Sequence, residues 1–472
     1  MVLPVLLMAY VLTGVYHLYK PLPDGLDVAT PYRAAQDVEF LVDSTWRDPR
    51  GEQHTQHEIF DAALEMIAQA QSLVLADFFL VNQFAGAVED GHRPLSKELV
   101  EGLTERRAEA SEEPEMLLIT DPFNTLYGGV NQPLFSRLEA HGIRVIETDL
   151  QALRDSNPVW SAAWRICCRW FGNDSDGGWL PNPVGHTPVT VRTYLELLNF
   201  KANHRKILVT DGPNGWTGLV TSGNPHDASS RHDNIAVRFR GPTAIDLLQT
   251  ESAVIEFSDG TPVAVPDPVR KKGAGVAEAR IRILTESRIR DAALEMIETA
   301  GDGDRLDLWM FYLSHRAVVR SLIAAQKRGV ELRLLLDPNR DAFGRKKQGI
   351  PNRPVARELH SAGVPIRWCN TAGEQCHAKM LLHRAGNGNA TLLAGSANFT
   401  RRNLDNFNLE TSVQVRADAS TAVIADAAEV FEARWNNEPD RIHSLPYEEY
   451  ADGSHLRYWR YRLMEATGLS SF

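Results

Sequence analysis

The chain has 472 residues, of which 43% are hydrophobic, and it contains 61 acidic and 50 basic residues. This length, without a low-complexity tract, predicts two substantial folded units. The formal net charge of -11 argues against a nucleic-acid enzyme, which needs a basic surface to offset phosphate repulsion, although a local basic groove is still compatible with it.

The first predicted element is a hydrophobic N-terminal segment, residues 1–20. From Val2 to Tyr16 the sequence is almost wholly apolar, and Lys20 ends the segment. The segment is short for a full membrane crossing, and it lacks the basic start of a secretory signal. We interpret it as a single membrane anchor, with an atypical signal peptide or a buried helix as the alternatives.

A duplication runs through the rest of the chain. The heptapeptide DAALEMI occurs at 61–67 and again at 291–297, with helical spacing of its apolar residues. Each copy is followed by strand candidates, the second of which ends in Asp-Pro, at Asp121 and Asp337. The recurring order of strands and helices predicts the α/β class: two half-domains, each a mixed sheet flanked by helices, related by a pseudo-twofold axis with one active site at their interface.

Domain boundaries follow from this duplication. We predict a first half-domain over residues 21–266, a linker over 267–276, and a second half-domain with a C-terminal tail over 277–472. The predicted linker is rich in charge and glycine, as linkers commonly are.

The first half carries an aromatic insertion at about residues 151–200. From matching glycines, 62 residues lead to the polar motif of the first half and 14 to that of the second, a difference of 48. Trp160, Trp164, Cys167 and Phe171 are spaced to share one helix face, with two arginines beside it. Such a face suits a membrane interface or the wall of an acyl-chain groove, whereas the alternative is a helix with buried tryptophans.

One polar constellation occurs in both halves, 173 residues apart. Each copy has a histidine and a lysine two residues apart and, 18 or 19 residues after the histidine, a serine and an asparagine two residues apart. The members are His204, Lys206, Ser222 and Asn224, then His377, Lys379, Ser396 and Asn398. Strand alternation puts each histidine and lysine on one face. Cations and amide donors suit the oxygens of a phosphate ester, and two histidines can attack and protonate it.

Each imidazole needs a partner that fixes its tautomer and orientation. Asp233 lies 29 residues after His204, and Glu410 lies 33 residues after His377, each next to an apolar strand-like run. These two acids are the candidate partners. The alternative for either acid is an ordinary charge at the edge of a strand.

The spacing of cysteine, histidine and acidic residues along the chain predicts neither a metal site nor a disulfide framework. No cluster of histidine, cysteine or acidic residues shows metal-ligand spacing, and the lysines can do the electrostatic work of a metal, so we expect no metal and no other cofactor. Cys167, Cys168, Cys369 and Cys376 show no disulfide framework, because adjacent cysteines are not expected to pair with each other. We expect all four to be reduced or buried.

The paired motif resembles that of the phospholipase D superfamily, the HKD phosphodiesterases. The first copy matches the full HxKxxxxD pattern, with Asp211 five residues after Lys206, and residues 395–404 are similar to the second-half signature of bacterial members. The resemblance spans roughly residues 40–435. The second copy departs from the pattern at Arg384, where an aspartate is expected. In the family that aspartate is largely structural, so the departure concerns local architecture more than chemistry.

The resemblance implies a phosphodiesterase that hydrolyses or transfers a phosphatidyl group, in the manner of phospholipase D or cardiolipin synthase. It implies His204 as the nucleophile that forms a phosphohistidine and His377 as the general acid, and the sequence alone leaves the reverse assignment open. The pairing of acids is swapped between the halves of two-domain members, which would join Asp233 to His377 and Glu410 to His204. The lysines, serines and asparagines of both copies would bind the phosphate.

The expected partners are a phospholipid substrate, a membrane surface, and water or an alcohol as acceptor, whereas nucleic acid is not expected. The oligomeric state is open, and we expect a monomer to be sufficient for activity. We expect association with a bacterial inner membrane, with its side left open. The choice between hydrolysis and transfer and the headgroup are also open. The alternatives are an HKD nuclease, which would explain the motifs but no other feature, and a non-catalytic scaffold, which would explain the missing second aspartate.

Overall fold

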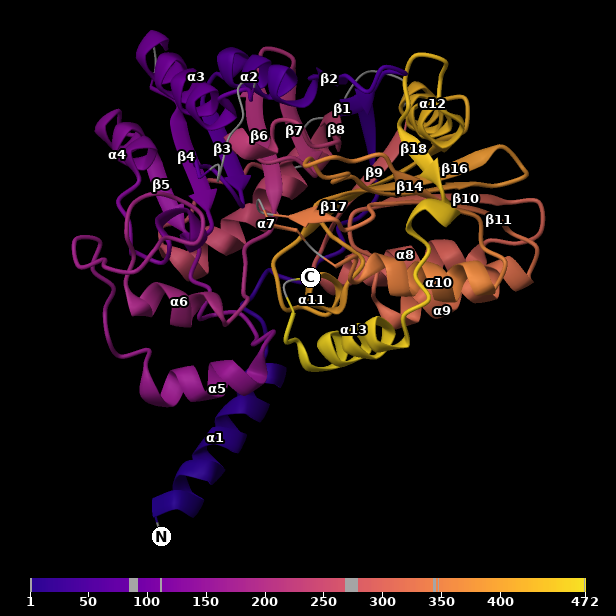
Figure 1. Cartoon of the computed structure of the whole chain (residues 1–472). Coiled ribbons are helices and arrows are strands. Elements are labelled where there is room, and N and C mark those ends of the chain that lie inside the picture. Colours follow the sequence, from indigo (N-terminus) through magenta and orange to yellow (C-terminus); the bar gives the residue numbers. More distant parts are fainter. Residues whose placement is uncertain are drawn as a thin grey trace.

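The computed structural model describes residues 2–84, 92–110, 113–267, 279–342, 345–346, 348–470 and 472. Over these residues a 16-stranded mixed sheet runs through both halves, with helices on its faces, so the predicted α/β class is confirmed (Figure 1). The predicted linker, 267–276, lies outside the described residues except for its first position. The other domain boundaries stay predictions.

The first half of the chain forms one side of the sheet, in the order β8–β7–β6–β3–β4–β5. Its strands are β1 (Arg33–Arg47), β2 (Gln53–Gln56), β3 (Leu73–Phe78), β4 (Glu115–Thr120), β5 (Arg144–Glu147), β6 (Lys206–Gly212), β7 (Gly215–Thr221) and β8 (Asn234–Arg240). Its helices are α1 (Val2–Tyr19), α2 (Ile59–Gln69), α3 (Leu95–Glu109), α4 (Pro133–Ala140), α5 (Pro158–Cys167), α6 (Val191–Leu197) and α7 (Pro242–Ser258). Two 3₁₀ turns are η1 (Pro122–Thr125) and η2 (Asp227–Ser229).

The second half repeats this arrangement, in the order β17–β16–β15–β10–β11–β14. Its strands are β9 (Ala279–Thr285), β10 (Arg305–Met310), β11 (Glu331–Leu336), β12 (Asp341–Ala342), β13 (Arg345–Lys346), β14 (Ile366–Cys369), β15 (Lys379–Arg384), β16 (Asn389–Gly395), β17 (Thr411–Asp418) and β18 (Ser444–Pro446). Its helices are α8 (Ser287–Thr299), α9 (Arg316–Lys327), α10 (Asn352–Ser361), α11 (Arg401–Leu404), α12 (Ala422–Asn436), α13 (His455–Thr467) and the 3₁₀ turn η3 (Tyr447–Tyr450).

The two halves pair their strands in the same way. β3 is antiparallel to β6 and parallel to β4, as β10 is antiparallel to β15 and parallel to β11. The halves join where the start of β1 pairs antiparallel with the start of β9. The duplicated heptapeptide lies in α2 and α8 and buries its two alanines, its methionine and its isoleucine in both copies. The predicted recurrence of strands and helices is therefore present.

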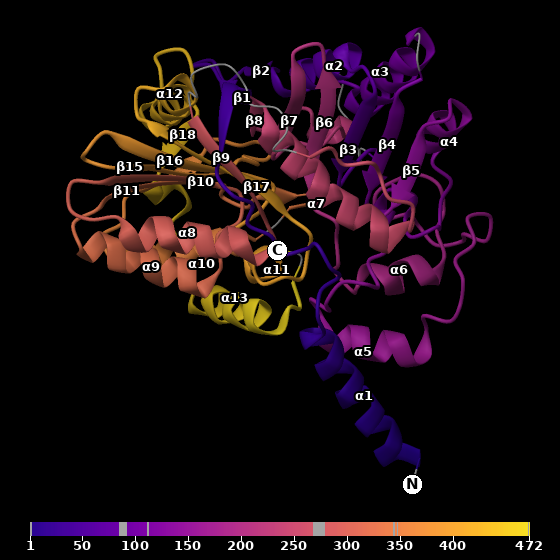
Figure 2. The same cartoon turned by 180° about the vertical axis from the view of Figure 1, so that it is seen from behind.

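Helices flank the sheet on both sides (Figures 1 and 2). One apolar core lies between α2, α3 and α4 and the first half of the sheet, and a second lies between α8, α9 and α10 and the other half. The largest core draws side chains from α7, α12 and the strands of both halves. This shared core holds the two halves in a fixed relation, which an active site between them requires.

The departure at Arg384 changes one contact between neighbouring strands. Asp211, in β6, accepts hydrogen bonds from the backbone N–H groups of Ser72 (2.8 Å) and Leu73 (2.7 Å) at the start of β3. Arg384, in β15, donates instead to Oδ2 of Asp307 in β10, at 2.8 Å. Each half thus ties its motif strand to the adjacent strand, but with side chains of opposite charge.

Replacing Asp211 by alanine should lower the free energy of unfolding by about 1–3 kcal/mol, because backbone donors at the start of β3 lose a charged acceptor. Urea denaturation measures this change. The matched control is Glu105→Ala, which removes an exposed carboxylate from α3 and should change the stability by less than about 0.5 kcal/mol. Equal stability of both variants would show that Asp211 does not support the strand contact.

The expectation that no disulfide forms is wrong. Cys167 is bonded to Cys168, and Cys369 is bonded to Cys376. α5 ends at Cys167, and Cys168 leaves the helical conformation with φ -129°. Cys369 ends β14 next to the segment that leads into β15, so the Cα atoms of the second pair are 6.2 Å apart, within the range of a disulfide. Spacing along the sequence does not show the proximity of the second pair.

The aromatic insertion buries some of its rings and exposes others. α5 ends at Cys167, so the predicted helix face does not extend to Phe171. Trp164 is fully buried, and the guanidinium of Arg192 lies over its ring. Trp170, Phe171 and Trp179 are exposed. The helix therefore packs into the protein, while the residues after it present aromatic rings to solvent.

The N-terminal segment forms α1, which packs against α5. The Tyr10 hydroxyl donates to the Val159 carbonyl at 2.8 Å, and Lys20 donates to the Gln151 carbonyl at 2.8 Å. Most of the apolar side chains of α1 are exposed. Among the helices that the structure describes, none combines the length and the apolarity needed to cross a bilayer.

Candidate active site

The two polar motifs meet where the halves of the molecule adjoin. His204 and His377 lie just before β6 and β15, two neighbours of the central strands β3 and β10. The backbone N–H of His204 donates to the Leu409 carbonyl of the second half at 2.9 Å, and that of His377 donates to the Asp233 carbonyl of the first half at 2.8 Å. Each histidine is therefore held by the opposite half. The residue that accepts its backbone N–H directly precedes the residue that contacts its imidazole.

Glu410 is the partner of the His204 imidazole, the pairing that the resemblance implied. Nδ1 of His204 lies 2.9 Å from Oε1 of Glu410. The Ser396 hydroxyl and the Asn403 amide donate to the same buried carboxylate. A carboxylate with several donors is an acceptor, so Nδ1 of His204 carries a proton and Nε2 is the nitrogen that can reach a substrate.

The predicted pairing of Asp233 with the His377 imidazole is wrong. Nδ1 of His377 lies 3.0 Å from Oδ1 of Asn234. The Asp233 carboxylate instead accepts from the backbone N–H of Thr45 at 3.0 Å and lies 3.5 Å from Arg434. Successive residues of a strand point to opposite faces, so Asp233 and Asn234 cannot both reach the histidine. The residue that orients His377 is therefore the amide of Asn234 and not the expected acid.

The two serines lie next to the histidine partners. Ser222 donates to Oδ1 of Asn234 at 3.0 Å, and Ser396 donates to Glu410. Both hydroxyl protons are thus directed at the residues that orient the imidazoles. The geometry favours a positioning role for the serines over the predicted phosphate contact.

The two asparagines of the motifs are held alike. Oδ1 of Asn224 accepts from the backbone N–H of Leu80 at 3.2 Å, and Oδ1 of Asn398 accepts from that of Tyr312 at 3.3 Å. Both side chains are buried. With the oxygen bound to backbone, the NH₂ group of each amide is the end that can donate to an anion.

The two lysines supply buried positive charge. Nζ of Lys206 and of Lys379 donates to the carbonyl of the histidine two residues before it. The rings of Phe79 and Phe311 lie 5.2 and 5.3 Å from these nitrogens. Burial lowers the pKa of Lys206 to about 7 and that of Lys379 well below its ordinary value. An anion would favour the charged form of both amines, so the site is suited to a group with several negative oxygens.

The two imidazoles differ in their affinity for a proton. Burial lowers the pKa of His204 to about 4, and the charge of Glu410 opposes this shift. Burial also lowers the pKa of His377 well below its ordinary value, and the charge of Lys379 lowers it further. Asn234 is a neutral partner and offers no opposing charge. The carboxylate partner therefore favours the protonated form of His204, whereas His377 has no such partner.

Two buried aspartates hold the segments that carry the histidines, and the sequence analysis did not assign them to the site. Asp121 accepts from the backbone N–H of Asn203 at 2.7 Å, and Asp337 accepts from that of Cys376 at 2.9 Å. Burial raises the pKa of both carboxyl groups to about 7. The repeated Asp-Pro after matching strands was the signal that could have identified them.

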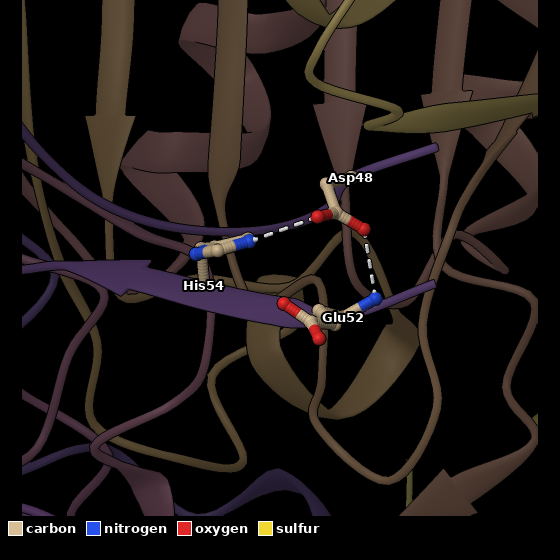
Figure 3. Close-up of side chains that lie close together, drawn as sticks. All are labelled: Asp48, Glu52 and His54. Carbon is tan, nitrogen blue, oxygen red and sulfur yellow. Dashed lines mark hydrogen bonds and ion pairs between the residues drawn. The ribbon is translucent and has the colours of Figure 1, made fainter. Parts of the chain in front are cut away.

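One group of potential metal ligands is found among the described residues. Ligand atoms of Asp48, Glu52 and His54 lie within 4.8 Å of one another at the turn between β1 and β2 (Figure 3). Oδ1 of Asp48 accepts from the backbone N–H groups of Arg50 and Glu52, both at 2.9 Å. These bonds close the turn, and Glu52 is exposed. The spacing of these residues along the chain did not predict the group, because only the turn brings the three side chains together.

Comparison with protein families identifies the fold around the second motif. Residues 293–435 match a family model described as cardiolipin synthase, PLD-like domain. This region contains His377, Lys379, Ser396, Asn398 and Glu410. This part of the chain is therefore similar to the PLD-like domain of the phospholipase D superfamily. A comparison with curated proteins finds no match to this chain.

One solved structure shares the fold at low sequence identity, and two others have lower TM-scores. Phosphatidylserine synthase from Haemophilus influenzae Rd KW20 has a TM-score of 0.57 and 9% identity, and the alignment covers 97% of each chain. Nuc, a phospholipase D family member from Salmonella typhimurium, has a TM-score of 0.27 and 21% identity over 34% of this chain and 97% of its own. Polyphosphate kinase from Porphyromonas gingivalis has a TM-score of 0.47 and 13% identity over 91% of this chain, which spans 53% of the kinase.

Proposed function

We propose that this chain is a phospholipid phosphodiesterase that hydrolyses or transfers a phosphatidyl group through a phosphohistidine. The observation that carries the proposal is the convergence of His204 and His377, from opposite halves, on a buried site with Lys206 and Lys379. The lysines and the amides of both motif asparagines would neutralise the non-bridging oxygens as charge develops in the transition state. Two imidazoles supply the nucleophile and the acid that a poor alkoxide leaving group needs.

The reaction has two steps in this proposal. Nε2 of one imidazole forms a bond to phosphorus while the bond to the headgroup oxygen breaks, and the second imidazolium gives its Nε2 proton to that oxygen. Water or an alcohol then attacks phosphorus and gives its proton to the second imidazole, and the phosphorus–nitrogen bond breaks. Both histidines end in their starting protonation states.

The partners of the imidazoles favour His377 as the nucleophile, the reverse of the order that the resemblance implied. A carboxylate at Nδ1 favours the protonated form of His204, and His377 has no carboxylate there. His377, paired with the neutral amide of Asn234, keeps a lone pair on Nε2. His204 then enters the reaction as the general acid.

A family match, a structural match and the net charge of the chain support a lipid substrate. The second half matches a domain described as cardiolipin synthase, and the fold is shared with a phosphatidylserine synthase over nearly the whole chain. The net charge of -11 is unfavourable for a nucleic-acid substrate. We infer association with a membrane for the same reasons, since the substrate resides there.

The test is mass spectrometry of lipids after purified protein is incubated with vesicles of phosphatidylglycerol and phosphatidylethanolamine, with His204→Ala as the blank. Phosphatidic acid alone would identify hydrolysis, and cardiolipin with released glycerol or ethanolamine would identify transfer. Single turnovers quenched in alkaline denaturant should place the phosphoryl group on a peptide containing residue 377. No lipid turnover, combined with cleavage of a nucleic acid, would contradict the proposal in favour of a nuclease.

Replacing Asn234 by aspartate should change the pH dependence of turnover. The new carboxylate at Nδ1 raises the pKa of His377, and protonated His377 cannot attack, so the acid limb of the kcat/KM profile should move upward by about one pH unit. The control is Asn389→Asp, an exposed amide of β16, which should leave the profile unchanged. An unmoved acid limb in Asn234→Asp would show that residue 234 does not govern the protonation of His377.

A further inference from the structure

Exposed apolar side chains are confined to one part of the molecule. Over the residues that the structure describes, the large apolar side chains that are exposed lie in three segments: α1, residues 159–198, and residues 456–469. Figures 1 and 2 both show α1, α5 and α13 at the same end of the molecule. Soluble surfaces usually scatter such residues singly, so their collection at one end indicates a binding surface.

The C-terminal helix α13 carries an apolar face that is exposed to solvent. Leu456, Trp459 and Leu463 are 81%, 66% and 63% exposed, and their spacing of three and four residues places them on one face. The opposite face is fixed to the protein: the Tyr461 hydroxyl accepts from Arg316 at 2.8 Å, and Glu465 accepts from Ser314 at 2.7 Å. Tyr461 also belongs to the apolar core, and Tyr458 and Met464 pack against it, so α13 has an apolar face toward the protein and a second one exposed to solvent.

The three segments adjoin one another. At the end of α13, a Cβ atom on Gly468 would lie 1.8 Å from the carbonyl oxygen of Ser156, just before α5. α1 packs on α5 through the hydrogen bond from Tyr10 to Val159. The exposed residues of α1, α5 and α13 consequently form one apolar face, which we call the basal face.

The charges on the basal face identify what binds there. α13 carries three arginines and one acid, and the acid, Glu465, is buried. Arg460 is exposed beside Trp459, and the guanidinium of Arg169 lies 4.2 Å from the ring centroid of Trp170. The basic character of α13 contrasts with the acidic chain as a whole, whereas residues 159–198 carry three arginines, two aspartates and one glutamate. Tryptophans flanked by arginines on an apolar face are typical of a surface that inserts between anionic phospholipid headgroups.

We propose that α13, together with α1 and residues 159–198, docks the protein on a phospholipid bilayer that contains anionic headgroups. The inference rests on the proposed function, because it explains how the site reaches a lipid substrate. Residues 198–203 connect the basal face to His204 along the chain. The C-terminal helix is then a second attachment point, remote in sequence from the apolar N-terminal segment.

Photolabelling tests the proposal without depending on catalysis. The full-length protein is bound to vesicles of phosphatidylglycerol and phosphatidylethanolamine that carry a photoactivatable group in the acyl chain, and labelled peptides are identified by mass spectrometry. We expect label within residues 455–469. The variant Leu456→Ser/Trp459→Ser/Leu463→Ser should lose this label and bind vesicles roughly tenfold more weakly, because it loses three apolar side chains from the contact.

The matched control is Leu456→Met/Trp459→Phe/Leu463→Met, which keeps the face apolar and should retain the label and the affinity. Label restricted to residues 1–20 and 159–198 would overturn the role of α13. A dimer in sedimentation equilibrium that the serine variant disrupts, with no label on α13, would assign the face to a second copy of the chain instead. Turnover of a short-chain phospholipid in free solution separates the two proposals: activity retained by the serine variant upholds the proposed function whatever the labelling shows.

Discussion

Alanine at position 204 or 377 should abolish turnover of the lipid substrate. Without His377 no imidazole lies beside Asn234 to attack phosphorus, and without His204 the proton held near Glu410 cannot reach the leaving oxygen. Removal of a residue that acts as part of a catalytic unit typically costs about four orders of magnitude or more in kcat. Single-turnover assays on phosphatidylglycerol vesicles measure this loss, since they report chemistry rather than product release.

The control for this prediction is His383→Ala. His383 lies further along β15 than His377, and its imidazole is 3.2 Å from Asp304. Its loss should change kcat by less than about threefold, because the contact lies outside the chemistry. Circular dichroism should show all three variants folded. Substantial residual activity in His204→Ala or His377→Ala would contradict the two-histidine mechanism.

Arg205→Ala should produce the largest loss of stability among the substitutions considered. Arg205 lies between the two catalytic candidates of the first motif but points away from them. Its guanidinium bonds to Glu251 of α7 at 3.0 Å and to Glu286, just before α8, at 2.8 Å. All three side chains are buried, so alanine would leave two carboxylates without their cation, and breaking a buried pair in this way costs about 3–5 kcal/mol.

This substitution should also reach the active site. Oε1 of Glu286, which Arg205 contacts, accepts the backbone N–H of Glu410 at 3.1 Å. The arginine therefore connects the first motif to the residue that orients His204 from the other half. Urea denaturation measures the stability. The kcat of the folded fraction should also fall, because Glu410 is displaced.

The matched control is Arg238→Ala. Arg238 also bonds to two carboxylates, those of Glu39 at 2.6 Å and Glu65 at 2.8 Å, but the side chains of these acids are 43% and 54% exposed. Exposed ion pairs contribute about 0.2–1 kcal/mol each, so this variant should remain close to the parent protein. Equal losses in the two variants would show that burial of the Arg205 cluster does not govern its strength.

The duplication was visible in the sequence because it rests on local periodicity. The heptapeptide in α2 and α8 buries the same four positions, as its helical spacing predicts. The alternation of strand residues places His204 with Lys206, and His377 with Lys379, on common faces without reference to any other part of the chain. The strand that follows each motif brings the asparagines to the same end.

Other features depended on contacts between residues that are distant along the chain. Asp233 and Asn234 are both polar and adjacent, and only the register of β8 against β1 and β7 decides which one reaches His377. The disulfide between Cys369 and Cys376 likewise depends on β14 ending beside the segment that leads into β15. A pattern of residue types does not contain such distances.

The sequence by itself determined the two-part α/β architecture and the catalytic pairs, because both follow from the short periods of helices and strands. The tertiary structure alone decided that Asn234 rather than Asp233 contacts His377, that the serines lie next to the histidine partners, and that α13 turns its apolar face outward. These outcomes depend on which segment packs against which, and packing is a property of the whole fold rather than of any local run of residues.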